Sequence, residues 1–115
     1  NVNKMIDLNK MWKIIKVNPK NQRNIIEVNF NDINIKEFLI IDVRSKREFN
    51  ETHLNGAINI PLPELKRNIE KHIKNKQMKI LVCCEYGIRS KKAAEIINDM
   101  GYMQVYNLKG GLENI

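Results

Sequence analysis

Two adjacent cysteines stand where a predicted buried strand ends and a predicted helix begins. The strand is expected at Lys79–Cys83 and the helix near Ser90, so Cys84 opens the short loop between them. The N-terminus of a helix offers unpaired N–H groups and the positive end of a dipole, and both stabilise an anion. A cysteine placed beside such groups is held more readily as the thiolate, which is its nucleophilic form. The sequence therefore predicts nucleophilic sulfur chemistry at this junction.

The two cysteines are expected to have different roles. Successive side chains of an extended segment point in opposite directions, so neighbouring cysteines face opposite sides of the chain. Cys83 follows Val82 in the strand, which predicts that it packs in the core as a small hydrophobic residue. Cys84 is the first residue of the loop and can face its interior. We therefore predict that Cys84 is the nucleophile.

The residues that follow Cys84 favour an anion-binding loop. Gly87 supplies the backbone freedom that lets several N–H groups converge on one point. Arg89, Lys91 and Lys92 add positive charge nearby. The expected result is a cup that activates a sulfur nucleophile and holds an anion above it.

Strands and helices alternate along the chain, as they do in a parallel sheet with helical connections. The apolar segments Phe38–Val43 and Lys79–Cys83 indicate strands buried on both faces. Ser45–Asn50 is expected to be a short helix, because Ser45 and Glu48 have the spacing of a capping box. The other expected elements are a helix at Met5–Val17, strands at Ile25–Val28, Ala57–Ile60 and Gln104–Tyr106, a helix opened by Pro61 and Pro63 with the apolar stripe Leu62, Leu65, Ile69 and Ile73, and a helix at Ser90–Met100 stopped by Gly101. We predict an α/β fold with a central, mostly parallel β-sheet flanked by helices on both faces.

The composition limits the class of protein. The chain has 115 residues, of which 43% are hydrophobic, and this suits one globular domain. No run approaches the roughly 18 apolar residues needed to cross a bilayer. The net charge of +7 comes from scattered basic residues without interleaved aromatics, so neither nucleic acid nor a membrane is expected as a partner. Two cysteines form no disulfide framework and no metal-ligand spacing, which predicts a cytoplasmic protein without a metal or other cofactor.

Four segments in the same order resemble the signatures of the rhodanese-like domain family. They are Ile41–Arg44, Arg47–Phe49 with Thr52–Pro61, the active-site loop Cys84–Ser90, and the C-terminal signature Val105–Gly111. The resemblance covers at least Leu39–Leu112 and agrees with the parallel α/β sheet expected from the residues themselves. We accordingly divide the chain into an N-terminal extension at 1–24, expected to be helical, and a rhodanese-like domain at 25–115.

The resemblance implies a single-domain sulfurtransferase that carries sulfur as a Cys84 persulfide. The donor would be thiosulfate or a persulfide, the acceptor cyanide or a thiol, and a protein donor or acceptor is an alternative. Glu85 departs from the basic or small residue that often follows the nucleophile in this family, and its charge opposes anion binding. The expected substrate-binding residues are those of the loop: Glu85, Tyr86, Gly87, Ile88, Arg89 and Ser90.

Several charged residues are expected to support the site. Asp42 and Arg44 end a strand near the base of the loop, where we interpret them as an ion-pair network that orders the site. Arg89 either binds the anionic donor or braces the loop. Glu48 is interpreted as a cap or ion-pair partner, and His53 as a structural residue near a turn.

Two other classes of function remain open at the level of sequence. The first is a non-turnover sulfur relay, a docking module, or a redox sensor in which Cys83 acts as the resolving thiol. The second is a cysteine phosphatase or arsenate reductase, because Cys83 and Arg89 have the spacing C-x5-R. Counted from Cys84, however, only four residues precede Arg89, and this shorter loop suits a sulfur atom better than a phosphate.

Overall fold

The computed structural model describes residues 24–115. The helix expected at Met5–Val17 and nearly all of the expected N-terminal extension lie outside the described residues. Within the described part no helix is both long enough and apolar enough to span a bilayer.

The described part of the chain is built on one five-stranded parallel sheet in the order β1-β5-β4-β2-β3. The strands are β1 (Ile25–Val28), β2 (Leu39–Asp42), β3 (Ile58–Asn59), β4 (Lys79–Cys83) and β5 (Gln104–Leu108). Two of the three inner strands, β4 and β2, are the continuous apolar runs seen in the sequence, and the register pairs Asp42 with Cys83. Because all strands are parallel, their carboxyl ends meet at one edge of the sheet.

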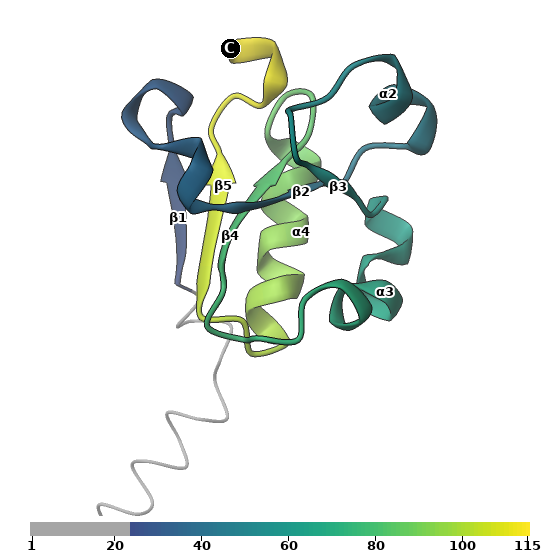
Figure 1. Ribbon diagram of the computed structural model, residues 1–115, viewed down its shortest axis with the longest axis vertical. Helices are drawn as coiled ribbons and strands as arrows, with labels where there is room; N and C mark the ends of the chain where they lie inside the picture. Colours follow the sequence, from purple (N-terminus) through teal and green to yellow (C-terminus); the bar gives the residue numbers. More distant parts are fainter. Residues whose placement is uncertain (1–23) are drawn as a thin grey trace, which may run out of the picture.

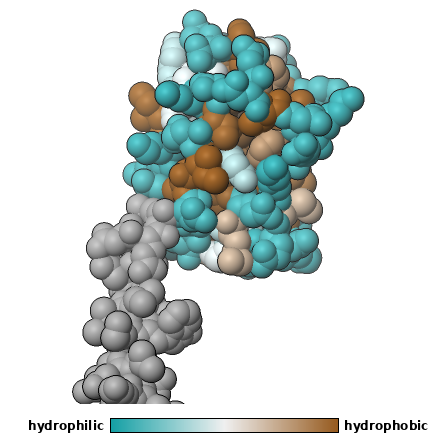
Figure 2. Space-filling model, turned by 90° about the vertical axis from the view of Figure 1, so that its left-hand side faces the viewer, coloured by the Kyte–Doolittle hydropathy of each residue, from teal (hydrophilic) through white to brown (hydrophobic). Residues whose placement is uncertain are grey.

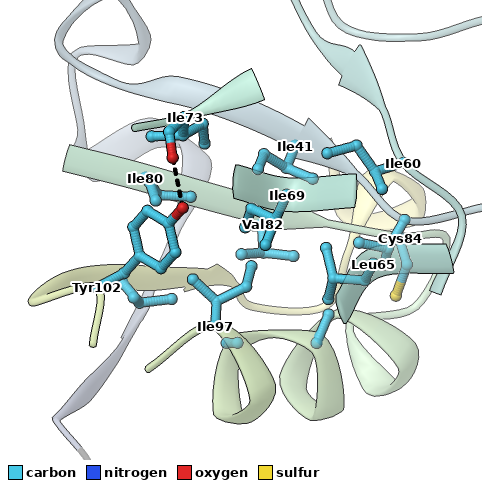
Figure 3. Close-up of a cluster of buried hydrophobic side chains, with 14 residues drawn as sticks. Ile41, Ile60, Leu65, Ile69, Ile73, Ile80, Val82, Cys84, Ile97 and Tyr102 are labelled. Carbon is cyan, nitrogen blue, oxygen red and sulfur yellow. Dashed lines mark hydrogen bonds between the residues drawn. The ribbon is translucent and has the colours of Figure 1, made fainter. Parts of the chain in front are cut away.

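One face of the sheet is covered by the helices α3 (Leu65–His72) and α4 (Ile88–Asp99) (Figure 1). The main core cluster lies between them and the sheet (Figure 3). Tyr102 occupies one end of this cluster and donates a hydrogen bond to the Ile73 carbonyl, while Cys84 lies at the other end beside Leu65 and Ile60. The hydrophobic core therefore extends directly to the loop that carries the candidate nucleophile.

The opposite face is covered by short 3-10 helices. A second core cluster there contains Ile40, Leu81, Cys83 and Leu108, packed against residues from η2 (Phe30–Asp32), η3 (Ile35–Glu37) and η5 (Leu112–Asn114). Two of these turns, η2 and η3, form the short, polar connection between β1 and β2, and η5 follows β5. The predicted α/β fold is confirmed, with α-helices on one face and mainly 3-10 turns on the other.

Most expected elements form, with shifted ends. The helix α2 (Lys46–Glu51) begins after Ser45, whose side chain completes the predicted capping box with Glu48. The helix expected to open at Pro61 starts as the 3-10 turn η4 (Leu62–Glu64) before α3 begins. The helix α4 starts two residues before Ser90, because Gly87 ends the loop in a left-handed conformation.

Figure 1 shows α2, the loop between β4 and α4, and the C-terminal turn η5 gathered at the same end of the molecule. Figure 2 shows the side of the molecule on which β1 forms the sheet edge, where hydrophobic surface is interrupted by hydrophilic residues. Ile26 of this edge strand is 46% exposed.

Candidate active site

Cys83 and Cys84 lie on opposite faces of the sheet, as the alternation of a strand predicts. Cys83 belongs to the cluster on the 3-10 face and is fully buried, and burial raises the pKa of its thiol far above the ordinary range. Cys84 belongs to the cluster on the α-helical face and follows the last residue of β4. Only Cys84 therefore faces the start of α4.

The sulfur of Cys84 is surrounded by hydrogen-bonding groups of its own loop. The backbone N–H groups of Gly87 and Ser90 donate to Sγ at 3.1 Å and 3.2 Å. The thiol in turn donates to the Ser90 hydroxyl oxygen at 3.3 Å. Two backbone N–H donors thus converge on this one sulfur atom where α4 begins. The geometry is that of the cup expected from the sequence, although it encloses the sulfur of Cys84 itself.

Gly87 is the residue that turns the loop into the helix. Its φ of +88° lies in the left-handed region that glycine adopts readily and other residues do not. A Cβ atom at this position would lie 3.1 Å from the Gly110 nitrogen and 3.3 Å from the Leu108 oxygen. Both the conformation and the close approach of the C-terminal turn therefore require glycine here.

Asp42 and Arg44 form the predicted ion-pair network beneath the loop. The Arg44 guanidinium donates to both Asp42 carboxylate oxygens, with a shortest distance of 2.7 Å, and also to the Thr52 carbonyl at 2.7 Å. Hydrogen bonding to Asp42 raises the pKa of Arg44 above its already high value. The same guanidinium lies 3.5 Å from the Glu85 carboxylate. One buried arginine thus holds the end of β2 and the first residue after Cys84.

Arg89 is braced by Glu48 instead of being free to bind a ligand. Its two terminal nitrogens donate to the two Glu48 oxygens at 2.9 Å and 3.0 Å. Glu48 also accepts from the Ser45 N–H in the capping box. The Arg89 hydrogen bonds, with help from Ser45, lower the pKa of Glu48 to about 2. Of the two roles considered for Arg89, this pairing favours bracing the loop against α2.

Tyr86 and Ile88 flank Gly87 and project outward. Their exposures of 64% and 77% are the highest among the large hydrophobic residues of the described part. Cys84 is only 1% exposed. A reaction partner therefore meets these two side chains at the rim of the loop before it meets the sulfur. Lys91 and Lys92 are exposed on the first turns of α4 that follow Ile88.

The C-terminal turn supports the loop from behind, a contact that the analysis of the sequence did not identify. The Leu112 and Glu113 N–H groups donate to the Cys84 and Glu85 carbonyls at 2.8 Å and 2.9 Å. The Asn107 amide reaches the Gly87 carbonyl at 3.2 Å. The only signal in the sequence was the C-terminal signature Val105–Gly111, to which no role had been given.

His53 has the expected structural role. Its ring stacks on Phe49 with centroids 3.7 Å apart, and Nδ1 lies 2.7 Å from the Phe49 carbonyl oxygen. Within residues 24–115 no group of three or more histidine, cysteine or acidic side chains is placed to hold a metal ion.

A phosphatase loop that starts from Cys83 does not fit this arrangement. The C-x5-R spacing requires Cys83 and Arg89 to serve one site. Cys83 is instead fully buried on the far face of the sheet, and Arg89 pairs with Glu48. The spacing in the sequence therefore does not correspond to a common site in space.

Comparison with known proteins places the chain in a family. A sequence model described as "Rhodanese-like domain" matches residues 25–115. The chain is 43% identical over 75 residues to thiosulfate sulfurtransferase PspE of Escherichia coli strain K12, an alignment that covers 65% of this chain and 71% of that protein. It is 33% identical over 78 residues to thiosulfate sulfurtransferase GlpE of Coxiella burnetii, covering 68% and 71%.

Solved structures agree with these sequence relationships. A rhodanese with anions from E. coli superimposes with a TM-score of 0.63 at 42% identity, covering 67% of this chain and 89% of that one. The resemblance stated from the sequence signatures is thereby confirmed. This chain belongs to the rhodanese-like domain family, and its enzyme class is that of a rhodanese-type sulfurtransferase.

Proposed function

We propose that the protein transfers a sulfane sulfur from thiosulfate or a persulfide to a thiophilic acceptor through a persulfide on Cys84. The observation that carries this proposal is the pair of N–H groups, from Gly87 and Ser90, directed at one cysteine sulfur. Such donors stabilise the attacking thiolate and also the anionic persulfide that follows.

The first half-reaction loads the cysteine. The Cys84 thiolate attacks the outer sulfur of thiosulfate and forms a new S–S bond. The S–S bond of the donor breaks, and sulfite leaves with the electron pair. The terminal persulfide sulfur carries a negative charge, which the loop N–H groups accommodate. The Ser90 hydroxyl, which accepts from the thiol at 3.3 Å, can turn to donate to the charged sulfur.

The second half-reaction removes the terminal sulfur from the Cys84 persulfide. A nucleophilic acceptor, such as cyanide or a thiolate, attacks the terminal sulfur of the persulfide. The Cys84–sulfur bond breaks, Cys84 returns as the thiolate, and thiocyanate or a new persulfide leaves. Transfer in two steps through a covalent intermediate predicts ping-pong kinetics.

Burial of the nucleophile supports transfer of a single sulfur atom. Cys84 is 1% exposed, and only four residues separate it from Arg89. A bulky phosphoryl group would need more room around Sγ and a free cation, whereas Arg89 is paired with Glu48. These features favour sulfur transfer over phosphatase or arsenate reductase chemistry.

A protein sulfur relay is a second candidate function. The exposed side chains of Tyr86 and Ile88 favour this function. Exposed hydrophobic surface beside the nucleophile can contact a protein partner but does not bind a small anion. A redox sensor that closes a Cys83–Cys84 disulfide is less favoured, since the two side chains lie on opposite faces of the sheet.

The division of the chain into domains and its location in the cell are also proposed. Residues 25–115 would form the sulfur-transfer domain and residues 1–24 an N-terminal extension, in a protein of the cytoplasm where Cys84 stays reduced.

Thiocyanate production tests the proposal. The wild-type chain is expected to form thiocyanate from thiosulfate and cyanide with parallel double-reciprocal plots, and Cys84→Ser is expected to form none. Cys83→Ala is the matched control, which keeps Cys84 and should retain turnover. Turnover by Cys84→Ser, or loss of turnover only in Cys83→Ala, would overturn the assignment.

A further inference from the structure

We propose that Asn107 is a positioning residue, which holds Gly87 by its carbonyl group so that the N–H of Gly87 faces the sulfur of Cys84. Glu27 on the edge strand β1 would fix the orientation of the Asn107 amide. This inference rests on the proposed function, because it assumes that Cys84 is the nucleophile whose reactivity matters.

The contacts form a chain from the sheet edge to the sulfur. Asn107 lies on β5 and is 1% exposed. Its Nδ2 group donates to the Gly87 carbonyl at 3.2 Å and to the two Glu27 oxygens at 3.1 Å and 3.0 Å. Gly87 in turn donates its N–H to Cys84 Sγ at 3.1 Å. Asn107 thus acts on the carbonyl side of the residue whose amide side serves the nucleophile.

Only one orientation of the Asn107 side-chain amide satisfies the neighbouring hydrogen-bonding groups. An amide nitrogen carries two hydrogens, and three acceptor oxygens face it, so one hydrogen serves Gly87 and the other the Glu27 carboxylate. A flipped amide would direct its oxygen at those same acceptors. In the orientation observed, Oδ1 is left buried without a hydrogen-bond partner, and it is the only such side-chain atom in the part of the chain that the structure describes.

The unpartnered oxygen distinguishes positioning from simple stabilisation. A buried polar atom without a partner lowers stability, and an apolar side chain of similar size would avoid that penalty. If Asn107 were replaced by such an apolar side chain, the Gly87 carbonyl would still accept a hydrogen bond from the Lys91 N–H, which lies at 3.3 Å. The Glu27 carboxylate is exposed, so water would solvate it. Asn107 is therefore poorly explained as a stabilising residue and well explained as a donor to the loop.

Alkylation of Cys84 as a function of pH tests the inference. Iodoacetamide reacts with the thiolate, so the midpoint of the rate profile reports how well the loop stabilises it. In Asn107→Leu the midpoint should rise by about one pH unit, which slows alkylation at neutral pH roughly tenfold. The temperature of unfolding should stay at or above that of the wild type. Asn98→Leu is the matched control, because that side chain donates to the Tyr102 carbonyl at the far end of α4. It should leave the alkylation profile unchanged.

A second variant keeps the test decisive. Asn107→Asp has nearly the same size but replaces the donor by an acceptor, so its midpoint should move in the same direction and further. A folded Asn107→Leu or Asn107→Asp whose profile superimposes on the wild type would overturn the proposal. Loss of folding in both would also overturn it, since Asn107 would then serve stability. Alkylation does not depend on sulfur transfer, so failure of the wild type to accept sulfur would count against the proposed function alone.

Discussion

At the scale of single residues, the site is defined by how the charges near Cys84 are already paired. Arg89 is bound by Glu48, and Arg44 is bound by Asp42 with Glu85 close by. Neither guanidinium is therefore free to attract an anionic donor. The groups that remain for an anion are the loop N–H donors, which carry only partial charge, and the exposed Lys91 and Lys92 at the start of α4. The choice of donor should consequently respond to the carboxylates that screen the arginines.

Glu85 offers the clearest test of that screening. Its carboxylate follows the nucleophile directly in sequence and is 30% exposed, so its negative charge opposes the approach of thiosulfate. In Glu85→Gln we expect kcat/KM for the doubly charged thiosulfate to rise about threefold to tenfold, and kcat/KM for a singly charged organic persulfide to rise less. Glu70→Gln removes the same charge on α3, far from the loop, and should leave both values unchanged. An equal change for both donors in Glu85→Gln would refute an electrostatic role.

At the scale of secondary structure, the loop is held from two sides. From one side α2 reaches Arg89 through Glu48, the same residue that caps α2. From the other, the turn after β5 donates two N–H groups to the carbonyls of Cys84 and Glu85. Since the loop itself is short, these neighbours decide its shape. Substitutions in α2 or in the turn after β5 should therefore change the reactivity of the Cys84 sulfur.

The link from α2 predicts a pH-dependent contribution to stability. The pKa of Glu48 is lowered from 4.5 to about 2, so the folded protein binds this proton less readily than the unfolded chain does. The stabilisation is complete above about pH 4.5 and is lost as the pH falls through about 2. The difference in unfolding free energy between wild type and Glu48→Gln should shrink over that interval. Because both side chains are partly exposed, the difference should not exceed about 1 kcal/mol.

Chemical denaturation at several pH values measures this contribution. Glu51→Gln lies in the same helix and pairs with Arg47 at the surface, so its difference from the wild type should stay flat across the interval. If the difference in unfolding free energy between wild type and Glu48→Gln were also independent of pH, the ion pair between α2 and the loop would not contribute to stability as predicted.

The link from the C-terminal turn is tested at Gly111. Its φ is +68°, and a Cβ atom there would lie 2.3 Å from the Glu85 oxygen and 2.6 Å from the Cys84 oxygen. Gly111→Ala should therefore displace the loop, reduce sulfur transfer more than tenfold and cost about 1–3 kcal/mol of stability. Gly101→Ala meets no atom within 4 Å despite a φ of +100°, so it should lose stability through strain alone and keep its activity. Equal activity in the two variants would show that the contact does not shape the site.

Element boundaries mark what the sequence could and could not predict. The central strands, the capping box and the opposite faces of the two cysteines follow from local patterns, and the structure bears them out. The start of α4 at Ile88 lies two residues before the expected Ser90, because the sequence shows a glycine at position 87 but not that its left-handed conformation begins the helix there. The layer of 3-10 turns between β1 and β2 has no periodic pattern in the sequence that would predict it.

At the scale of the whole molecule, the parallel sheet assembles the site from distant parts of the chain. The pair Glu48–Arg89 joins residues 41 apart, and the pair Glu27–Asn107 joins residues 80 apart. The sequence predicted Glu27 and Asn107 on or beside strands, Glu48 in a short helix and Arg89 in the loop before a helix. The order of the strands decides which of these residues meet. The sequence does not show that β1 pairs with β5, so it could not predict that Glu27 contacts Asn107 or that Asn107 contacts the loop of Cys84. The nucleophile was predictable because its loop is continuous in sequence.

The central claim is that this assembly loads one sulfur atom onto Cys84, and intact-protein mass spectrometry tests it most directly. Reduced wild-type protein, Cys83→Ala and Cys84→Ser would each be exposed to thiosulfate and, separately, to an organic persulfide. We predict that wild type and Cys83→Ala gain the mass of one sulfur atom, that cyanide removes it, and that Cys84→Ser gains nothing. A wild-type protein that gains no sulfur from either donor, or a gain that survives in Cys84→Ser, would contradict the account.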